Sequence, residues 1–367
     1  MLGRMKRREL LGVLTVLAPL SAVRPAHAGV APRALTFPAD FGAHPDTRTE
    51  WWYLTGVLQA TVSGAPHEFG FQVTFFRSRT GVGAGSPSRF APTQLVFAHA
   101  ALGDPAQQRQ RHDQCIARAG FGIAEAASGD TDVRLRGWSL VRSGAPDRSV
   151  YRATIASDRA AFALDLQCAT TQPVLLQGQA GFSAKAPQPG PASHYYSQPQ
   201  LQAQGQLTLD GQALPVQGRA WLDHEWSDAL LHPEVVGWDW IGMNLDDGSA
   251  LTAFRLRRTD GSALYAGGSL RNAAGQQRNF APDEVRFTPG RQWQSPASQA
   301  RYPVEWTIDT PAGRHRVQAR FDAQELDSRA STGAWYWEGL CDLRGAGDAR
   351  VGRGYLEMTG YAGRLVL

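Results

Sequence analysis

A hydrophobic period of two runs through much of this chain and restricts its fold more than any other feature. Residues 201–209 alternate apolar with polar side chains, the Asp210-Gly211 dipeptide follows, and apolar residues return at Leu214 and Val216. Such alternation is typical of strands with one buried face, and Asp-Gly between two such runs predicts a hairpin. With 39 glycines and 22 prolines in 367 residues, the chain favours short strands and turns, so a helical bundle is not expected.

The same pattern recurs along the sequence. Residues 69–75 and 162–166 alternate in the same way, and turn signals stand between apolar runs at 246–248, 260–261 and 310–313. We therefore predict an all-β fold built as a succession of antiparallel hairpins.

Two short motifs occur twice and in the same order. The pattern Trp52-x-x-x-Gly56 recurs as Trp238-x-x-x-Gly242, and the run at 218–223 (Gly-Arg-Ala-Trp-Leu-Asp) recurs at 352–357 (Gly-Arg-Gly-Tyr-Leu-Glu). Repetition of two motifs in order indicates an internal duplication.

The duplication predicts two consecutive antiparallel β-barrels, one over residues 29–230 and one over 231–367. Each copy is long enough to close into a barrel of eight or more strands, which would remove the exposed edges of an open sheet. The segment Leu231-His232-Pro233 is the expected linker.

The N-terminus has the anatomy of an export signal. Basic residues including Arg7-Arg8 precede an apolar run at 10–20 and the small-residue site Ala26-His27-Ala28. We expect residues 1–28 to be a twin-arginine-like signal peptide, cleaved before Gly29, and the mature protein to be periplasmic. No later run approaches the ~20 apolar residues of a membrane-spanning helix, so no transmembrane anchor is expected in the mature chain.

The net charge of +4 also belongs to this segment. The whole chain has 37 lysines and arginines against 33 acidic residues, and the first 28 residues hold the entire excess. The remainder is neutral, so a nucleic-acid partner has no electrostatic support.

Several motifs stand out in this sequence. They are Glu50-Trp51-Trp52-Tyr53 with Gly56, the strand at 69–77 ending Phe75-Phe76-Arg77, Ala98-His99-Ala100, Asp223-His224-Glu225-Trp226 and Gly237-Trp238-Asp239-Trp240. Together they resemble one family, that of the carotenoid 1,2-hydratases (hydroxyneurosporene synthases) and AttH-type lipocalin-like proteins. The resemblance spans residues from about 37 to the C-terminus. It implies two consecutive lipocalin-like barrels, a lipophilic small-molecule ligand and no organic cofactor. Members with known activity add water to the terminal double bond of acyclic carotenoids.

Residues 221–240 contain the groups that alkene hydration needs. A carboxyl group kept protonated by apolar surroundings can act as the acid, aromatic faces stabilise a carbocation, and a histidine can deprotonate water. The carboxyls are Asp223, Glu225 and Asp239, the base is His224, and the aromatic walls are Trp226, Trp238 and Trp240.

Alternation along this strand refines the assignment. His224 and Trp226 share a face with Leu222, whereas Asp223 and Glu225 share the other. We predict that His224 and Trp226 face the ligand, at a position that matches a functional His-x-Trp in the family hydratases, and that Asp239 is the acid within reach of the same space. The alternative interpretation of His-x-Trp is a packed tryptophan beside a hydrogen-bonded histidine.

Other candidates lie outside this stretch. Glu50, beside three aromatic residues, is a predicted ligand-binding residue, although a buried carboxylate also fits a structural ion pair with an arginine. Tyr195 follows a proline-rich loop and is predicted to line a barrel mouth. His99 lies in an apolar strand, where a hydrogen-bonded core histidine is the simpler interpretation.

Metal and hydrolase chemistry find little support. The pattern His-Glu-x-x-His is not met, and no Gly-x-Ser-x-Gly elbow occurs, so we expect neither a metal nor a catalytic serine. Of the three cysteines, Cys115, Cys168 and Cys341, any pair or none could be bridged.

Three functions remain open from the sequence. One is an exported protein that binds a lipophilic, isoprenoid or lipid-like ligand, as a carrier linked to a membrane transport system, because lipocalin-type barrels enclose apolar ligands. The second is a cofactor-free hydratase or lyase acting on an isoprenoid or carotenoid double bond. The third is a structural role for one filled barrel.

Overall fold

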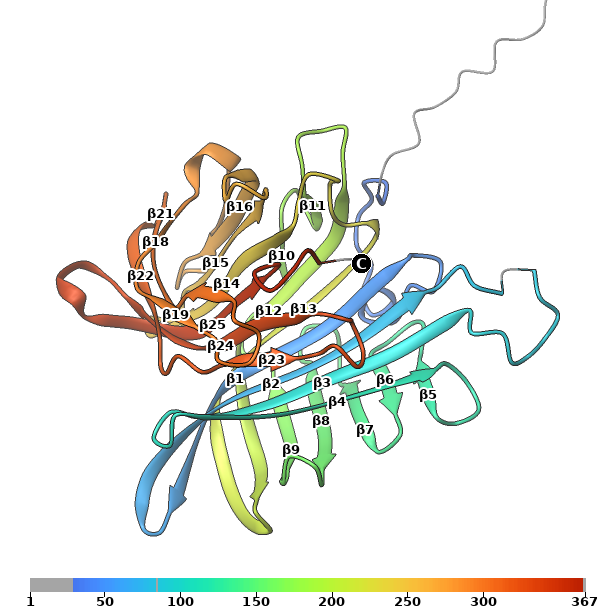
Figure 1. Cartoon of the computed structure of the whole chain (residues 1–367), viewed down its shortest axis with the longest axis horizontal. Coiled ribbons are helices and arrows are strands. Elements are labelled where there is room, and N and C mark those ends of the chain that lie inside the picture. Colours follow the sequence, from blue (N-terminus) through green and yellow to red (C-terminus); the bar gives the residue numbers. More distant parts are fainter. Residues whose placement is uncertain (1–28, 84, 366–367) are drawn as a thin grey trace, which may run out of the picture.

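The computed structural model describes residues 29–83 and 85–365, and the expected signal segment 1–28 lies outside these residues. Their regular structure is almost entirely β-strand, arranged as two large antiparallel sheets and one two-stranded ribbon (Figure 1). The prediction of an all-β fold is therefore confirmed.

Sheet A takes the first part of the chain. Its strands are β1 (Thr49–Val62), β2 (Ala65–Arg79), β3 (Gln94–Asp104), β4 (Arg109–Arg118), β5 (Ala124–Ala126), β6 (Asp132–Leu135), β7 (Trp138–Ser143), β8 (Val150–Ser157), β9 (Phe162–Ala169), β10 (Leu175–Leu176), β11 (Phe182–Ala184), β12 (Ala192–Leu209) and β13 (Gln212–Ala229). A short 3₁₀ turn, η1 (Ala39–Phe41), precedes it.

Sheet B takes the rest. Its strands are β14 (Gly237–Leu245), β15 (Ala250–Arg257), β16 (Ala263–Arg271), β17 (Gln277–Phe280), β18 (Arg286–Pro289), β21 (Glu305–Thr310), β22 (Gly313–Ala319), β23 (Glu325–Asp327), β24 (Trp335–Arg344) and β25 (Arg350–Thr359). The ribbon is β19 (Gln292–Gln294) with β20 (Arg301–Pro303), and the remaining 3₁₀ turns are η2 (Pro282–Glu284) and η3 (Ala346–Asp348).

The predicted hairpins are present. β12 and β13 are joined at Asp210-Gly211, whose backbone φ angles are 49° and 81°. Positive φ at both central residues is the geometry of the tight turn that matches strand twist. The turns at 246–248, 260–261 and 310–313 likewise join consecutive strands.

Both sheets follow one topology. The first strand of each sheet pairs with its second strand on one side and with its last strand on the other, β1 with β2 and β13, and β14 with β15 and β25. The repeated run at 218–223 lies on β13 and its copy at 352–357 lies on β25. The repeated motifs thus occupy corresponding strands.

The two sheets differ in closure. Sheet A curls into a nearly closed barrel, whereas sheet B is a half-barrel whose edge strands β17 and β18 do not pair with each other (Figure 1). The prediction of two consecutive lipocalin-like barrels is confirmed, with the second barrel only half closed.

Apolar side chains fill the space inside each sheet and the space between the sheets. Trp52, Leu54 and Phe71 belong to the barrel interior of sheet A, and Trp306 and Trp337 to that of sheet B. A third cluster fills the junction of the two sheets, with Tyr53, Trp221, Trp240, Phe254 and Tyr355 among its members. Burial of one such side chain is worth about 1.5–3 kcal/mol.

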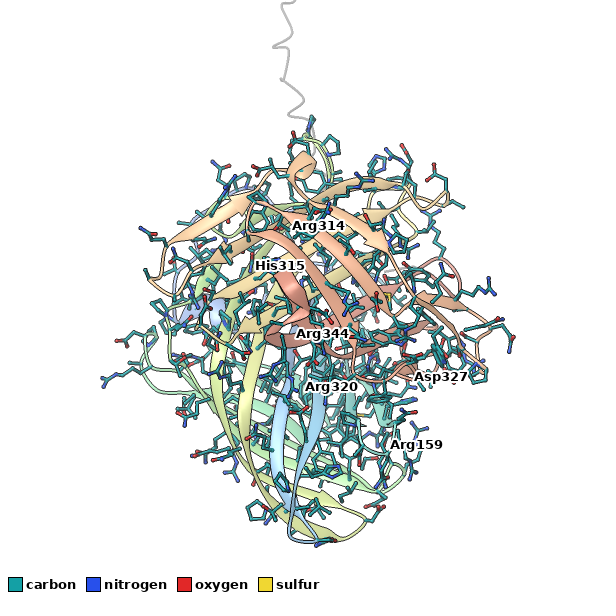
Figure 2. The ribbon with its side chains drawn as sticks, turned by 90° about the vertical axis from the view of Figure 1, so that its left-hand side faces the viewer. Arg159, Arg314, His315, Arg320, Asp327 and Arg344 are labelled. Carbon is teal, nitrogen blue, oxygen red and sulfur yellow. The ribbon has the colours of Figure 1, made fainter. Side chains whose placement is uncertain are left out.

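Ion pairs cross the junction beside this cluster. Arg320 lies 3.4 Å from Glu68 of β2 and 3.2 Å from Asp342 of β24, and Figure 2 shows Arg320 where the two sheets meet. Arg353 of β25 binds the same two carboxylates. These contacts hold the halves in one orientation.

Two further sequence questions are answered by the described residues. Cys115, Cys168 and Cys341 are all free thiols. In the same part of the chain, no helix has the length and apolar character needed to cross a bilayer.

Candidate functional site

Strand β13 presents its side chains alternately to two buried environments. Leu222 and Trp226 point into the barrel of sheet A, whereas Trp221 belongs to the junction cluster. Asp223 and Glu225 lie on the same side as Trp221 and are 3% and 6% exposed. The predicted division of this strand into two faces is confirmed, and both faces are covered.

A cavity of ≈ 130 Å³ lies on the junction side of β13. Strands of both sheets line it, and aromatic side chains form a large part of its wall. The aromatic lining residues are Trp51, Tyr53, Phe76, Phe97, Tyr195, Trp238, Trp240, Phe254 and Tyr336. The polar ones include Asp223, Glu225, Glu338, Glu357, Lys185 and His99. We call this space the junction cavity.

Asp223, in the cavity wall, accepts hydrogen bonds from three side chains. Tyr195 Oη donates to its Oδ2 at 2.8 Å, and Ser197 Oγ and Trp221 Nε1 donate to its Oδ1 at 2.5 and 2.7 Å. Trp240 Nε1 in turn donates to Tyr195 Oη at 3.2 Å. Burial outweighs these donors and raises the pKa of Asp223 to about 7.

The second carboxylate of β13 has a cationic partner. Lys185 Nζ lies 2.7 Å from Glu225 Oε1, and Ser193 Oγ donates to the same oxygen. The ammonium group also lies 4.8 Å from the Phe254 ring centre and 5.1 Å from that of Tyr195. This end of the cavity therefore carries a neutralised ion pair.

Two glutamates of sheet B complete the polar wall. Glu338 of β24 stands directly opposite Glu357 of β25 in the strand register. Burial and the neighbouring Glu357 carboxyl raise the pKa of Glu338 well above its usual range, and burial raises the pKa of Glu357 to about 7. Like charges this close cannot both form easily, so Glu338 is the proton-bearing member.

Two buried polar atoms in this wall lack good partners. Glu338 Oε1 and the Tyr53 hydroxyl make no hydrogen bond of good geometry within residues 29–83 and 85–365, although the two side chains are neighbours. Glu338 is 1% and Tyr53 6% exposed. Burial and the neighbouring Glu338 carboxyl raise the pKa of the Tyr53 hydroxyl well above its usual range, so the two groups interact with each other.

His99 closes the cavity on the β3 side. Its Nδ1 lies 2.8 Å from the Tyr336 hydroxyl and its Nε2 lies 2.7 Å from Ser331 Oγ. Burial lowers the pKa of the imidazole to about 3, so the ring is neutral at pH 7. The sequence predicted a hydrogen-bonded histidine at this position, and these contacts agree with that. The structure also places His99 in the cavity wall.

Three of the predicted ligand-binding residues line the junction cavity, namely Tyr195, Trp238 and Trp240. His224, Trp226 and Glu50 do not. They point into the barrel of sheet A, where all three are at most 1% exposed. The junction cavity adjoins the opposite face of β13, so His224 and Trp226 do not line it. That these two residues face the ligand stays a prediction.

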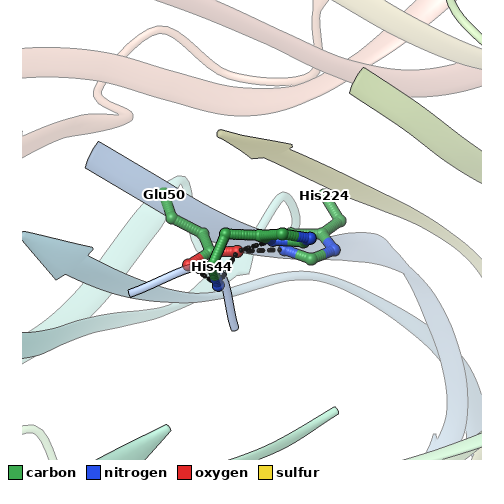
Figure 3. Close-up of side chains that lie close together, drawn as sticks. All are labelled: His44, Glu50 and His224. Carbon is green, nitrogen blue, oxygen red and sulfur yellow. Dashed lines mark hydrogen bonds and ion pairs between the residues drawn. The ribbon is translucent and has the colours of Figure 1, made fainter. Parts of the chain in front are cut away.

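Inside the barrel, Glu50 joins two histidines (Figure 3). His44 Nδ1 lies 2.7 Å and His224 Nε2 lies 2.9 Å from Glu50 Oε1, and Arg77 Nε donates to Oε2 at 2.7 Å. His224 also stacks on Trp52 with ring centres 4.5 Å apart. The contact with Arg77 matches the alternative interpretation of Glu50, a structural ion pair with an arginine.

Protonation in this network follows from its partners. Burial disfavours charge on Glu50, but the two histidines outweigh it and hold the pKa of the carboxyl far below its usual range. Burial lowers the pKa of His224 to about 4, so this ring is neutral and donates from Nε2. Burial opposes charge on His44 as well, yet hydrogen bonds to Asp40 and Glu50 raise the pKa of its imidazole.

His44, Glu50 and His224 also have the composition of a metal site, since their donor atoms lie within 4.8 Å of one another. However, one Glu50 oxygen already accepts from both rings and the other accepts from Arg77. The guanidinium supplies the positive charge that a cation would bring. Their chemistry fits a structural hydrogen-bond network.

Asp239 lies inside sheet B rather than in the junction cavity. Its Oδ2 is 2.7 Å from Arg255 Nε and 3.2 Å from Arg257 Nε, and Tyr361 Oη donates to its Oδ1 at 2.9 Å. Asp239 does not line the junction cavity, because Trp238 and Trp240 occupy the junction face of β14 and leave Asp239 the opposite one. Its assignment as the acid stays a prediction.

The sequence reasoning missed Glu338 and Glu357 as site residues. One signal was available, since the duplicated run aligns Asp223 with Glu357, and both point into the junction cavity. Glu338 has no counterpart in either repeated motif. It reaches the site only through the pairing of β24 with β25.

Comparisons with known proteins agree with this architecture. A sequence model described as AttH-like matches residues 28–361. The crystal structure of a putative AttH, NE1406 from Nitrosomonas europaea, is 48% identical with a TM-score of 0.81, covering 90% of this chain and 98% of that one. No curated protein sequence matches the chain.

Two more distant structures share the fold alone. Kievitone hydratase from Nectria haematococca is 14% identical with a TM-score of 0.67, covering 89% of this chain and 93% of that one. CghA with Sch210972 is 12% identical with a TM-score of 0.54, covering 86% and 90%.

Proposed function

This chain belongs to the AttH-like family, and from that premise we propose that it binds a lipophilic, alkene-bearing molecule in the junction cavity and catalyses the addition of water to it. The observation that carries the proposal is a set of three carboxyl groups around a space lined largely by apolar side chains, two of them buried and that of Glu357 half-buried. Asp223, Glu338 and Glu357 all have raised pKa values there. Burying carboxyl groups without pairing them is costly, so their retention points to acid–base chemistry.

The proposed reaction uses the two glutamates as a proton donor and acceptor. Glu338, in its protonated form, gives its proton to one alkene carbon, and the other carbon becomes cationic. Water adds to that carbon and loses a proton to the Glu357 carboxylate. Transfer of this proton from Glu357 to its cross-strand neighbour Glu338 restores the starting state, and the net change is one water added across one double bond.

The aromatic wall suits this reaction. The faces of Trp238, Trp240 and Phe254 line the cavity and can stabilise a carbocation through their ring electrons. The apolar surroundings also keep the acid protonated at neutral pH.

The cavity size limits what is bound. A volume of ≈ 130 Å³ is below the roughly 300–1,000 Å³ of ordinary ligand pockets. We therefore propose that the cavity takes one end of an isoprenoid-like molecule, and that the rest of a longer chain lies outside it. The name kievitone hydratase describes that distant relative and guides only the choice of reaction class to test.

Binding without chemistry is the second candidate. It is favoured by the largely apolar lining and by the closed Lys185–Glu225 pair, which leaves that end of the cavity without free charge. In that case the protein carries the lipophile unchanged.

One experiment separates these functions. Ligands are extracted from purified wild-type protein and from Glu338→Gln protein and identified by mass spectrometry. For a hydratase, we expect the wild type to carry a molecule heavier by the mass of one water than the molecule trapped in the variant. For a carrier, both proteins should hold the same molecule.

A control variant tests whether the extracted molecule occupies the cavity. Trp238→Ala removes cavity wall, whereas Trp293→Ala removes a tryptophan of the β19–β20 ribbon. Only the first should lose the ligand. Equal retention by both would place the molecule elsewhere and contradict the proposal.

We also propose that the protein is exported, on the basis of the basic, apolar and Ala-His-Ala segments of residues 1–28. Protein recovered from the periplasm should begin at or near Gly29. Replacement of Arg7 and Arg8 by lysine should leave precursor in the cytoplasm if the route needs the arginine pair. Cytoplasmic wild-type protein that retains Met1 would contradict export.

A further inference from the structure

The exposed large apolar side chains of the described residues gather at one end of sheet A. Val82 is 61%, Phe90 68%, Phe121 48% and Ile123 46% exposed. They come from the β2–β3 and β4–β5 connections, which lie on the same side of the molecule in Figure 1. We call these four side chains the apolar tip. Grouped exposed apolar side chains mark interaction sites more often than isolated ones do.

The tip is held together by specific contacts. The rings of Phe90 and Phe121 stack with centres 5.3 Å apart and planes 9° apart. Arg118 Cζ lies 4.6 Å from the Phe121 ring centre, and its Nη1 donates to the Phe90 carbonyl at 2.5 Å. The two connections are therefore joined through their aromatic rings.

Positive charge surrounds the tip. Arg89 precedes Phe90, Arg118 packs on both rings, and the Arg136 amide donates to the Ile123 carbonyl. Within residues 29–83 and 85–365, none of these three arginines forms an ion pair with a carboxylate. The nearest acidic residues of this end neighbour a different arginine, with Asp132 bound to Arg134 and Glu125 opposite it in the register.

An apolar row connects the tip to the junction cavity. Trp51, Phe76, Phe97 and Ile116 lie side by side across β1, β2, β3 and β4. The first three line the cavity. Leu95, two residues from Phe97 along β3, is paired with Arg118, which packs on Phe90 and Phe121 of the tip. The row is half-buried along its length.

We propose that the apolar tip inserts into the surface of an anionic phospholipid bilayer, and that the apolar row leads a lipophilic ligand between the bilayer and the junction cavity. Aromatic rings favour the boundary between lipid and water, and arginines bind anionic headgroups. Insertion rests on the tip alone, whereas ligand transfer rests on the proposed function.

Vesicle co-sedimentation tests the insertion without any ligand. The probes are vesicles of phosphatidylcholine, alone or mixed with phosphatidylglycerol, and all proteins carry the same N-terminus. We expect the wild type to prefer the anionic vesicles, and Phe90→Ser/Phe121→Ser to reduce partitioning about tenfold because two buried rings are lost. Arg89→Gln/Arg136→Gln should weaken binding to anionic vesicles and reduce its salt dependence. Arg286→Gln/Arg301→Gln, which changes exposed arginines of β18 and β20, should do neither.

A site-specific probe reports on the tip itself. An environment-sensitive dye on Phe90→Cys should shift to shorter wavelength when anionic vesicles are added, and the same dye on Arg314→Cys of β22 should not. Unchanged partitioning of the tip variants, or no shift at position 90, would overturn the proposal. A third outcome would also overturn it: the wild type forms a dimer and does not bind vesicles, and the tip variants lose the dimer. The tip would then be a contact with a second copy of the chain. None of these readouts depends on a substrate, so hydratase activity can fail while insertion holds.

Discussion

Replacement of Glu338 by glutamine should lower turnover by about 10²–10⁴-fold and leave the fold intact, because the amide keeps the shape of the side chain but has no acidic proton. Rates are measured on the molecule identified by ligand extraction. The acidic limb of the wild-type pH profile should follow the base, with turnover rising as the pH rises through about 7, where Glu357 becomes a carboxylate. The basic limb should follow loss of the proton of Glu338, whose pKa is raised well above its usual range.

A stability measurement gives the same variant a second readout. The pKa of Glu338 is raised in the folded protein, so the native state binds more protons than the unfolded state at pH values above the unfolded pKa of about 4.5. The free energy of unfolding of the wild type should therefore fall as the pH rises. Because glutamine does not titrate, the stability of Glu338→Gln relative to the wild type should increase from pH 5 to pH 8. Glu325→Gln, a sheet B carboxyl bound by Ser298 and Tyr302, is the control for both measurements. Full turnover in Glu338→Gln would remove Glu338 from the mechanism.

The local structure, above all the hairpins, was predictable from the sequence. Hairpins depend on alternation and turn residues that are neighbours in the chain, so the β12–β13 hairpin with its Asp210-Gly211 turn was predictable to the residue. The duplication was also visible, because its two copies keep similar residues on strands that occupy matching places in each sheet.

The site was less predictable because both faces of its main strand are covered. On β13, alternation separates His224 from Asp223 but does not tell which side meets the barrel interior and which meets the second sheet. Both sides contain aromatic and titratable groups, so the presence of such groups does not tell which side faces the cavity. Glu338 and Glu357 lie more than 100 residues from Asp223 in the chain, and only the packing of the two sheets brings them to one cavity.

How far each barrel closes was also not predictable from the sequence. The length of the second copy permits a closed barrel, yet strand number and stagger must agree for a sheet to close. In sheet B, β17 and β18 remain unpaired edges, and the arginines that hold Asp239 fill part of its interior.

His224→Ala should destabilise the protein by about 3–5 kcal/mol and leave ligand affinity unchanged. The variant leaves the buried Glu50 carboxylate without one of its donors and removes the ring that stacks on Trp52. Thermal or urea unfolding measures the loss, and retention of the extracted ligand measures affinity below the melting temperature.

Trp226→Ala should have a loss of similar size, about 3–5 kcal/mol, because it empties a fully buried site in the barrel of sheet A against which the His44 ring stacks at 3.8 Å. Trp238→Ala is the matched comparison, since its side chain is only half-buried and lines the junction cavity. It should cost much less stability and weaken ligand retention more. This reciprocal pattern would follow from the two faces of the sheet having separate tasks, one holding the barrel together and the other meeting the ligand. If His224→Ala or Trp226→Ala instead abolished ligand retention at unchanged stability, the barrel interior would be the binding site and the junction cavity would lose its assigned role.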